Sequence, residues 1–275
     1  MLIGIFSSTI KRIAHEKNCS LDEAAEFVKN LGITSAELSS GELRSPDYPD
    51  YRAVLDRHGI SISCVHHSAS LGSADDAVYG AAILDTLHLV DEAGKAGAPF
   101  VMILPVQMAD VADMGADRQR ALERSAEGLR YISAYAHTKG ITIIIENISR
   151  EILPFSTISD LKYLAENVPF LRLNYDVGNF RCVAIDVLEA YEALKGYFVF
   201  SHIKDWKYTE EGGLVAKDGA HLVDSYHGQG VLPFDEILSR LKRDGYNGWY
   251  IIEQGANELE QKLPVSVALL KKYDK

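Results

Sequence analysis

Residues 141–147 read Ile-Thr-Ile-Ile-Ile-Glu-Asn, an apolar run that stops at a carboxylate. A series of β-branched residues indicates a strand that is covered on both faces, which is typical of parallel strands in α/β proteins. A glutamate at the end of such a strand is costly to desolvate unless a positive or hydrogen-bonding group meets it. Glu146 is therefore both the end of a predicted strand and a candidate functional residue.

Three later strands end in the same way. Leu-Arg-Leu-Asn-Tyr is followed by Asp176, Phe-Val-Phe-Ser by His202, and Gly-Trp-Tyr-Ile-Ile by Glu253. Side chains alternate between the two faces of a strand, so these residues can share the inward face of a closed sheet. The pattern predicts that Glu146, Asp176, His202 and Glu253 meet near the carboxyl ends of adjacent strands, where barrel enzymes keep their chemistry.

Apolar runs alternate with amphipathic stretches along all 275 residues, without a composition break or linker. We predict strands at 2–7, 35–39, 60–66, 99–104, 141–147, 171–177, 197–204 and 248–254. Helices are predicted at 21–31, 46–58, 77–96, 117–139, 159–167, 185–195, 234–243 and 258–273. Eight strand–helix units predict one (β/α)8 TIM-barrel domain over residues 1–275. An open doubly wound sheet is the alternative, but no glycine-rich fingerprint follows the first strand.

Composition narrows the class of partner. The chain has 28 Lys and Arg against 39 Asp and Glu, a net charge of −11, which counts against general binding to nucleic acid. Its three cysteines show no pairing or zinc-ligand spacing, as expected in a reducing cytoplasm. The start lacks a basic leader, and no apolar stretch approaches the ~20 residues that a membrane helix needs. We therefore expect a cytoplasmic protein without a membrane or nucleic-acid partner.

Three carboxylates that converge without compensation repel one another, so at least one would have to take up a proton. A divalent metal ion removes that problem. Three oxygens and one imidazole nitrogen suit Mn²⁺, Mg²⁺, Co²⁺ or Zn²⁺, and no sulfur ligand narrows the choice. Alternatively, each of the four residues is a polar group of the barrel rim that bonds to a neighbouring strand or loop.

Five short motifs recur at or just after the predicted strand ends: Ile-Ile-Glu-Asn (144–147), Asp-Val-Gly-Asn (176–179), His-Ile-Lys-Asp (202–205), His-Gly-Gln-Gly (227–230) and Ile-Ile-Glu (251–253). With these motifs the chain resembles the xylose-isomerase-like barrel superfamily. This superfamily includes ketose 3-epimerases, hydroxypyruvate isomerase, inosose dehydratase and endonuclease IV. The resemblance implies that Glu146, Asp176, His202 and Glu253 bind one divalent metal, and that the two glutamates act as an acid/base pair.

The sequence also departs from branches of that superfamily. Asn179 stands where the three-metal nucleases often have a further histidine, and Ser225 stands where they have a carboxylate. Both differences favour a single metal. Ketose 3-epimerases usually carry a second glutamate six residues after the first ligand, whereas this chain has Ile152 there and Glu151 one residue earlier. The epimerase subclass is therefore left open.

Further candidates surround the four strand ends. Lys204 shares the face of His202 and could neutralise a substrate anion or enolate, or pair with Asp205 or a carboxylate at the rim. His66 could act on a sugar hydroxyl or pack as a satisfied histidine. We assign substrate binding to Glu37, His66, Lys204 and His227, with Gln107 as a weaker candidate. Phe6 and Trp206 could form an apolar wall against a sugar, or pack in the core.

These residues predict a metal-dependent sugar isomerase or epimerase that acts through an enediolate on a small ketose, aldose or polyol derivative. Three alternatives are a keto-inositol dehydratase, an endonuclease IV-like phosphodiesterase and a non-catalytic sugar-binding barrel. The expected partner is a small sugar, and a homo-oligomer is possible. The long polar excursion at 205–232 is expected to cover the barrel mouth, with His227 nearest the substrate.

Overall fold

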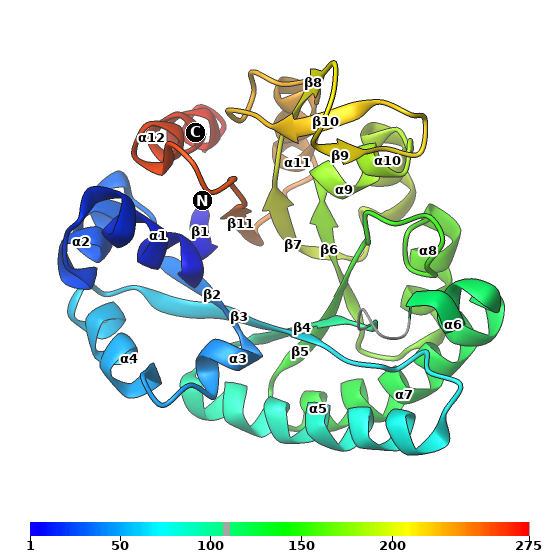
Figure 1. Cartoon of the computed structure of the whole chain (residues 1–275). Helices are drawn as coiled ribbons and strands as arrows, with labels where there is room; N and C mark the ends of the chain where they lie inside the picture. Colours follow the sequence, from blue (N-terminus) through cyan, green and yellow to red (C-terminus); the bar gives the residue numbers. More distant parts are fainter. Residues whose placement is uncertain (107–110, 275) are drawn as a thin grey trace.

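The computed structural model describes residues 1–106 and 111–274 and contains a closed barrel of eight parallel strands (Figure 1). The order around the barrel is β1-β11-β7-β6-β5-β4-β3-β2, so consecutive units are neighbours and the first strand closes on the last. The predicted (β/α)8 barrel is thereby confirmed. Its strands are β1 (Leu2–Phe6), β2 (Ser35–Ser39), β3 (Ser61–Ser68), β4 (Phe100–Leu104), β5 (Thr142–Glu146), β6 (Arg172–Asp176), β7 (Phe198–Ile203) and β11 (Trp249–Ile252).

Helices surround the barrel (Figure 1). The eight predicted ones appear within two residues of their expected ends: α2 (Leu21–Leu31), α4 (Tyr48–Arg57), α5 (Asp76–Ala96), α7 (Arg118–Thr138), α8 (Ile158–Asn167), α10 (Val187–Leu194), α11 (Phe234–Arg243) and α12 (Leu259–Lys271). Four further helices were not predicted from the sequence: α1 (Ser7–Lys17), α3 (Ser40–Leu43), α6 (Val111–Ala116) and α9 (Val177–Cys182). Three of these, α1, α3 and α9, begin directly after a strand ends, so they contribute to the mouth of the barrel.

Local signals set several of these boundaries. At the start of α2, the Ser20 hydroxyl accepts the Glu23 backbone N–H at 3.2 Å, and the Glu23 carboxylate accepts the Ser20 N–H at 2.8 Å. This reciprocal pair satisfies N–H groups that the first helical turn leaves free. The helix ends at Gly32, whose φ of 94° is one that glycine adopts without steric cost.

One layer of apolar side chains fills the barrel below the proposed site. It consists of Cys64, Met102, Ile144, Phe200 and Ile251, all buried. On three of these strands, the residue two positions further along is Glu146, His202 or Glu253, so the polar layer lies directly above the apolar one. The interior is narrow at β1, where a Cβ on Gly4 would lie 2.6 Å from Cδ1 of Ile251.

The excursion at 205–232 folds as a small antiparallel sheet of β8 (Trp206–Thr209), β9 (Leu214–Val215) and β10 (His221–Asp224). Figure 1 shows this sheet at the rim of the barrel, near α9 and α11. The buried side chains of Cys182, Ala216 and Leu222 pack it against α9. It therefore forms part of the wall of the mouth, which differs from the expected cover.

Asp205 closes this excursion at its base. Its carboxylate accepts backbone N–H bonds from Gly228 at 2.9 Å, Gly230 at 3.0 Å and Leu232 at 3.3 Å. A Cβ on Gly230 would lie 2.2 Å from the Trp206 carbonyl oxygen, so the chain can approach this closely only at a glycine. The Asp205 carboxylate and the His-Gly-Gln-Gly segment thus hold each other in place.

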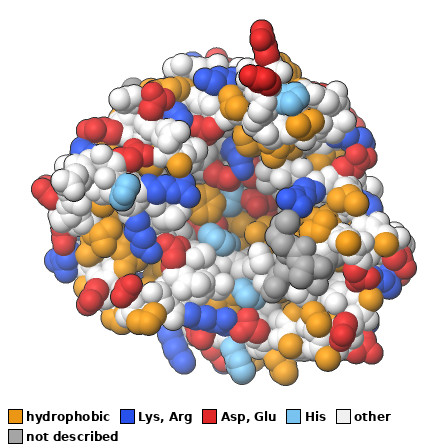
Figure 2. Space-filling model, in the orientation of Figure 1, with side chains coloured by type: hydrophobic (Ala, Val, Ile, Leu, Met, Phe, Trp, Pro, Cys, Tyr) orange, Lys and Arg blue, Asp and Glu red, His pale blue; other side chains and the backbone are white. Residues whose placement is uncertain are grey.

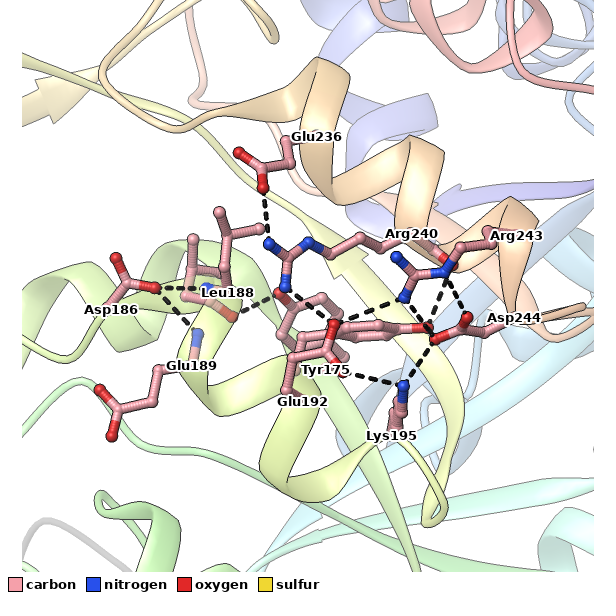
Figure 3. A network of polar contacts seen from close by, with 12 residues as sticks. Tyr175, Asp186, Leu188, Glu189, Glu192, Lys195, Glu236, Arg240, Arg243 and Asp244 are labelled. Carbon is pink, nitrogen blue, oxygen red and sulfur yellow. Dashed lines mark hydrogen bonds and ion pairs between the residues drawn. The ribbon is translucent and has the colours of Figure 1, made fainter.

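A polar network joins α10 and α11 behind β6 (Figure 3). Arg240 pairs with Glu192 at 2.8 Å across the two helices and with Glu236 at 2.6 Å along its own helix. Surface pairs of this kind contribute little individually. The buried anchor is Tyr175, whose hydroxyl donates to the Val187 carbonyl oxygen at 2.8 Å. It fixes the start of α10 to the strand that carries Asp176.

Candidate metal centre at the barrel mouth

The structure brings together the four residues at the ends of β5, β6, β7 and β11. Glu146, Asp176, His202 and Glu253 each present one ligand atom, and these atoms all lie within 4.8 Å of one another. Donors on opposite sides of a divalent ion are about 4 Å apart, because metal–ligand distances are about 2.0–2.2 Å. The spacing of the four side chains therefore suits one metal ion.

Asp176 is held with one oxygen free. Its Oδ1 accepts the backbone N–H of Asn179 at 2.9 Å, which caps α9. Asn147 exchanges hydrogen bonds with the backbone of Asp176 at 3.0 and 3.1 Å, and Asn179 donates to the Asn147 carbonyl at 3.0 Å. The other oxygen, Oδ2, is buried and has no hydrogen-bond partner in the described chain. The two asparagines thus aim a free carboxylate oxygen at the cluster.

His202 is oriented in a similar way. Its Nε2 lies 3.0 Å from Oε2 of Glu37, whereas its Nδ1 faces the cluster, 2.5 Å from Oε1 of Glu146. That second contact is an ion pair without hydrogen-bond geometry, so Nδ1 is a buried atom that makes no hydrogen bond among the residues described. A buried polar atom without a hydrogen bond is costly, and one divalent ion could bind both of these atoms. The carboxylate–histidine pair is the arrangement that usually orients a metal-binding imidazole.

The electrostatics of the four side chains agree with this picture. Burial would lower the pKa of His202, but the Glu37 and Glu146 carboxylates outweigh burial and raise that pKa well above its usual value. Burial also raises the pKa of Asp176 well above its ordinary range. A divalent ion would replace these protons, because metal ligands must be deprotonated.

Lys204 extends over the cluster from the end of β7. Its Nζ pairs with Oε1 of Glu253, and this pairing outweighs burial in raising the pKa of the lysine. The stem of Lys204 crosses Gly178, where a Cβ would lie 2.8 Å from the lysine Cγ and Cδ. The Trp206 indole N–H donates to the Gly178 carbonyl at 3.0 Å. Glycine in the Asp-Val-Gly-Asn motif therefore leaves room for the lysine.

The other predicted substrate-binding residues lie in different places. Glu37 is fully buried, and its two oxygens contact Nδ1 of His66 at 2.9 Å and Nε2 of His202 at 3.0 Å. It therefore positions the two histidines and does not face open space. Burial would raise the pKa of Glu37, but the two imidazoles lower it to about 2. Gln107 lies outside the described residues.

His227 is also away from the open mouth. Its ring is buried, stacks on Phe234 and lies with Nε2 3.2 Å from the Glu253 carbonyl oxygen. It therefore lies behind Glu253, which differs from the expected position nearest the substrate. Trp206, which belongs to the same excursion, lines a cavity beside the four clustered residues.

Two cavities open beside the cluster. One of about 470 Å³ is lined by Glu253, Lys204, His66, Phe6 and Trp206, together with Ser8, Thr9, Arg12, Asp224, Gln254 and Gly255. The other, of about 420 Å³, is lined by Glu146 and by mainly apolar residues that include Leu104, Val106, Ile148 and Leu153. Figure 2 shows acidic and histidine side chains at the bottom of the depression in this face. The two glutamates thus border different cavities.

Some residues of the site were not predicted from the sequence. Asn174 donates to Oε1 of Glu146 at 2.9 Å, and its position two residues before Asp176 was a signal for the inward face. Ser8, Thr9 and Arg12 belong to α1, which was not predicted. Within the described residues, every helix lacks the length or apolar character needed to cross a membrane.

The family follows from the fold, the site and a sequence comparison. The family model for the xylose isomerase-like TIM barrel matches residues 25–273. This match covers most of the chain, which therefore belongs to the xylose isomerase-like TIM barrel family.

Particular relatives differ in their activities. The chain is 27% identical over 197 residues to L-ribulose-5-phosphate 3-epimerase UlaE of Escherichia coli K12, an alignment that covers 71% of this chain and 63% of that protein's length. The solved structure of D-psicose 3-epimerase from Clostridium cellulolyticum H10 has a TM-score of 0.73, with 18% identity and 99% of each chain covered. The probable 3-DHS dehydratase AsbF of Bacillus anthracis has a TM-score of 0.75, with 15% identity, and covers 98% of this chain and 99% of its own. The two structures share the fold.

Proposed function

We propose that this protein is an epimerase or isomerase of a small ketose or aldose that depends on one divalent metal ion and acts through an enediolate. The observation that supports this most is the convergence of Glu146, Asp176, His202 and Glu253, with Asp176 Oδ2 and His202 Nδ1 buried and without hydrogen bonds among the described residues. These four residues would hold the metal. The epimerase relative gives independent support for sugar chemistry.

A divalent ion bound there would polarise the substrate carbonyl and make the neighbouring C–H bond more acidic. The chain supplies two carboxylates that can move that proton. Glu146 ends β5 and Glu253 ends β11, with β6 and β7 between them in the barrel. Each glutamate borders its own cavity, so the two can reach opposite faces of a flat enediolate. One removes the proton, and return to the other face or the next carbon gives epimerisation or isomerisation.

Other side chains would hold the substrate. Lys204 places its ammonium group beside Glu253, where it can stabilise a developing enolate oxygen. His66 lines the same cavity and is fixed by Glu37, whose hydrogen bond outweighs burial and raises the pKa of the imidazole. Phe6 contacts the rings of His66 and His202 edge-on, at centroid distances of 5.6 and 5.1 Å. Together with Trp206 it would present an apolar wall to a sugar and limit the entry of water.

Metal content tests the ligand set directly. The purified protein should contain one divalent ion per chain by elemental analysis. His202→Ala should lose most of that metal, because three carboxylates without the imidazole make a poorer site. His88→Ala, which removes an exposed histidine of α5, serves as the matched control and should keep its metal. Full metal content in His202→Ala would rule out this ligand set.

Proton exchange tests the reaction. In D₂O, active protein should place deuterium on the carbon next to the carbonyl of a ketose that it accepts. Glu146→Gln and Glu253→Gln should each abolish net turnover, while one variant can still exchange the substrate proton and the other the product proton. Turnover without deuterium incorporation would indicate a hydride shift and remove both glutamates from these roles. Release of water from the sugar would indicate a dehydratase.

A further inference from the structure

The cavity bordered by Glu253 extends to the first turns of α1. Ser8, Thr9 and Arg12 line it from that helix, while Lys204 and Glu253 line it from the barrel. One small molecule in this cavity can therefore contact both the proposed metal centre and α1. The charges along the cavity decide what the far end of that molecule can be.

The carboxylates that line this cavity are already paired. Glu253 contacts Lys204. Asp224 accepts hydrogen bonds from Lys262 Nζ at 2.6 Å and from the Gly255 backbone N–H at 2.8 Å. In contrast, the side chain of Arg12 is exposed and makes no ion pair or hydrogen bond with the part of the chain that the structure describes. Arg12 is therefore the lining cation whose charge is still available.

The start of α1 adds to this positive end. Its N-cap position is Phe6, which offers no side-chain cap, and its first turn contains no acidic residue. Free N–H groups and the helix dipole make such an end attractive to anions. Thr9, in the same turn, lines the cavity and is only 2% exposed, yet its hydroxyl has no partner among the described residues. The hydroxyl can therefore donate a hydrogen bond to an oxygen-rich ligand group in the cavity.

We infer that the substrate carries an anionic group, a phosphate monoester or a carboxylate, at the end away from the reacting carbons. Arg12 and Thr9 bind this group together with the amino end of α1. The inference rests on the proposed function, which places the reacting carbons between Glu146 and Glu253. Neutral sugars should then be poor ligands. The charge of the substrate would be recognised by α1, a helix that contributes none of the four proposed metal ligands.

Calorimetric binding measurements test this with ribulose, ribulose 5-phosphate, 5-ketogluconate and inorganic phosphate. The native protein should bind at least one anionic ketose about tenfold or more tightly than ribulose, since one charge-assisted contact is worth about that factor. Arg12→Gln should remove this preference and leave the affinity for ribulose within about twofold. Arg12→Lys should restore part of it, and Thr9→Val should weaken only the anionic ligands. The anion that responds identifies phosphate or carboxylate as the source.

Arg172→Gln is the matched control, because it removes an exposed arginine at the amino end of β6 and should change none of these affinities. The inference is overturned if Arg12→Gln weakens ribulose and the anions equally or weakens neither. It is also overturned if no anion, including inorganic phosphate, binds better than ribulose. Binding is read without turnover, so the two proposals can fail separately. Selective anion binding without deuterium exchange would reject the epimerase, and exchange without anion selectivity would reject the anion site.

Discussion

Glu37 and His202 are 165 residues apart in the chain, and the glutamate Oε2 lies 3.0 Å from the imidazole Nε2. The other glutamate oxygen meets His66 at 2.9 Å, so one fully buried carboxylate fixes two histidines of the mouth. This contact turns Nδ1 of His202 toward the three proposed carboxylate ligands. The residue that orients His202 therefore comes from β2, which lies on the other side of the barrel axis from β6.

Glu37→Gln should weaken metal binding by about 10–100-fold, the usual cost of losing a partner that orients a metal ligand. A glutamine offers a single acceptor oxygen, so it cannot accept hydrogen bonds from both imidazoles. Titration with a chelating indicator measures the affinity. Glu23→Gln, an exposed change that preserves the capping box of α2, is the control. Equal affinity in both variants would show that Glu37 does not orient His202 for a metal.

Gly178→Ala should lower kcat by about tenfold or more, because removing a positioned electrostatic group commonly costs that much. The added Cβ would lie 2.8 Å from the stem of Lys204 and push its ammonium group away from Glu253. Metal content should stay at the level of the native protein. Gly196→Ala is a matched control, since a Cβ there meets nothing within 4 Å. An unchanged kcat in Gly178→Ala would show that turnover does not depend on the position of the Lys204 ammonium group.

His227 gives a pH dependence of stability with a defined sign. Burial lowers the pKa of this histidine to about 4, below its unfolded value of about 6.5. Below pH ~6.5 the unfolded chain binds a proton at this histidine that the folded chain does not bind. The unfolding free energy therefore decreases as the pH falls. Between pH ~7.5 and ~5, the native protein should lose about 2 kcal/mol more unfolding free energy than His227→Gln. Urea unfolding with chelator present measures this difference, and parallel losses would contradict a neutral buried His227.

Tyr175→Phe should lower the unfolding free energy by about 1–2 kcal/mol, because it leaves the buried Val187 carbonyl without its hydrogen bond. The ring remains to pack with Phe198, whose centroid is 4.7 Å away. Denaturant titration gives the change in stability, with Tyr131→Phe as an exposed control. The metal content should be unaffected. Loss of metal at native stability would mean that Tyr175 acts on Asp176 and does not simply anchor α10.

The sequence alone predicted the eight barrel strands and the helices that follow clear signals. The run at 143–145 is apolar on both faces, which occurs where helices cover one side and a packed barrel interior the other. Capping at Ser20 and the glycine at 32 defined α2 because these effects are local. The alternation of side chains also placed Glu146, His202 and Glu253 one layer above Ile144, Phe200 and Ile251. Strand geometry fixes that relation without knowledge of the rest of the fold.

Tertiary structure decided what could not be predicted locally. The helix α1 starts with Ser-Ser-Thr after Phe6, and these residues are weak helix formers without a capping side chain, so packing against the barrel has to stabilise it. Its Arg12 therefore had no predicted position. Closure of the barrel brings Glu37 on β2 to His202 on β7. The sequence determined which residues end the strands, because that depends on neighbours along the chain. The partners of Glu37 and His227, and the position of Arg12 beside the cavity, depend on contacts between distant segments, which only the closed barrel creates.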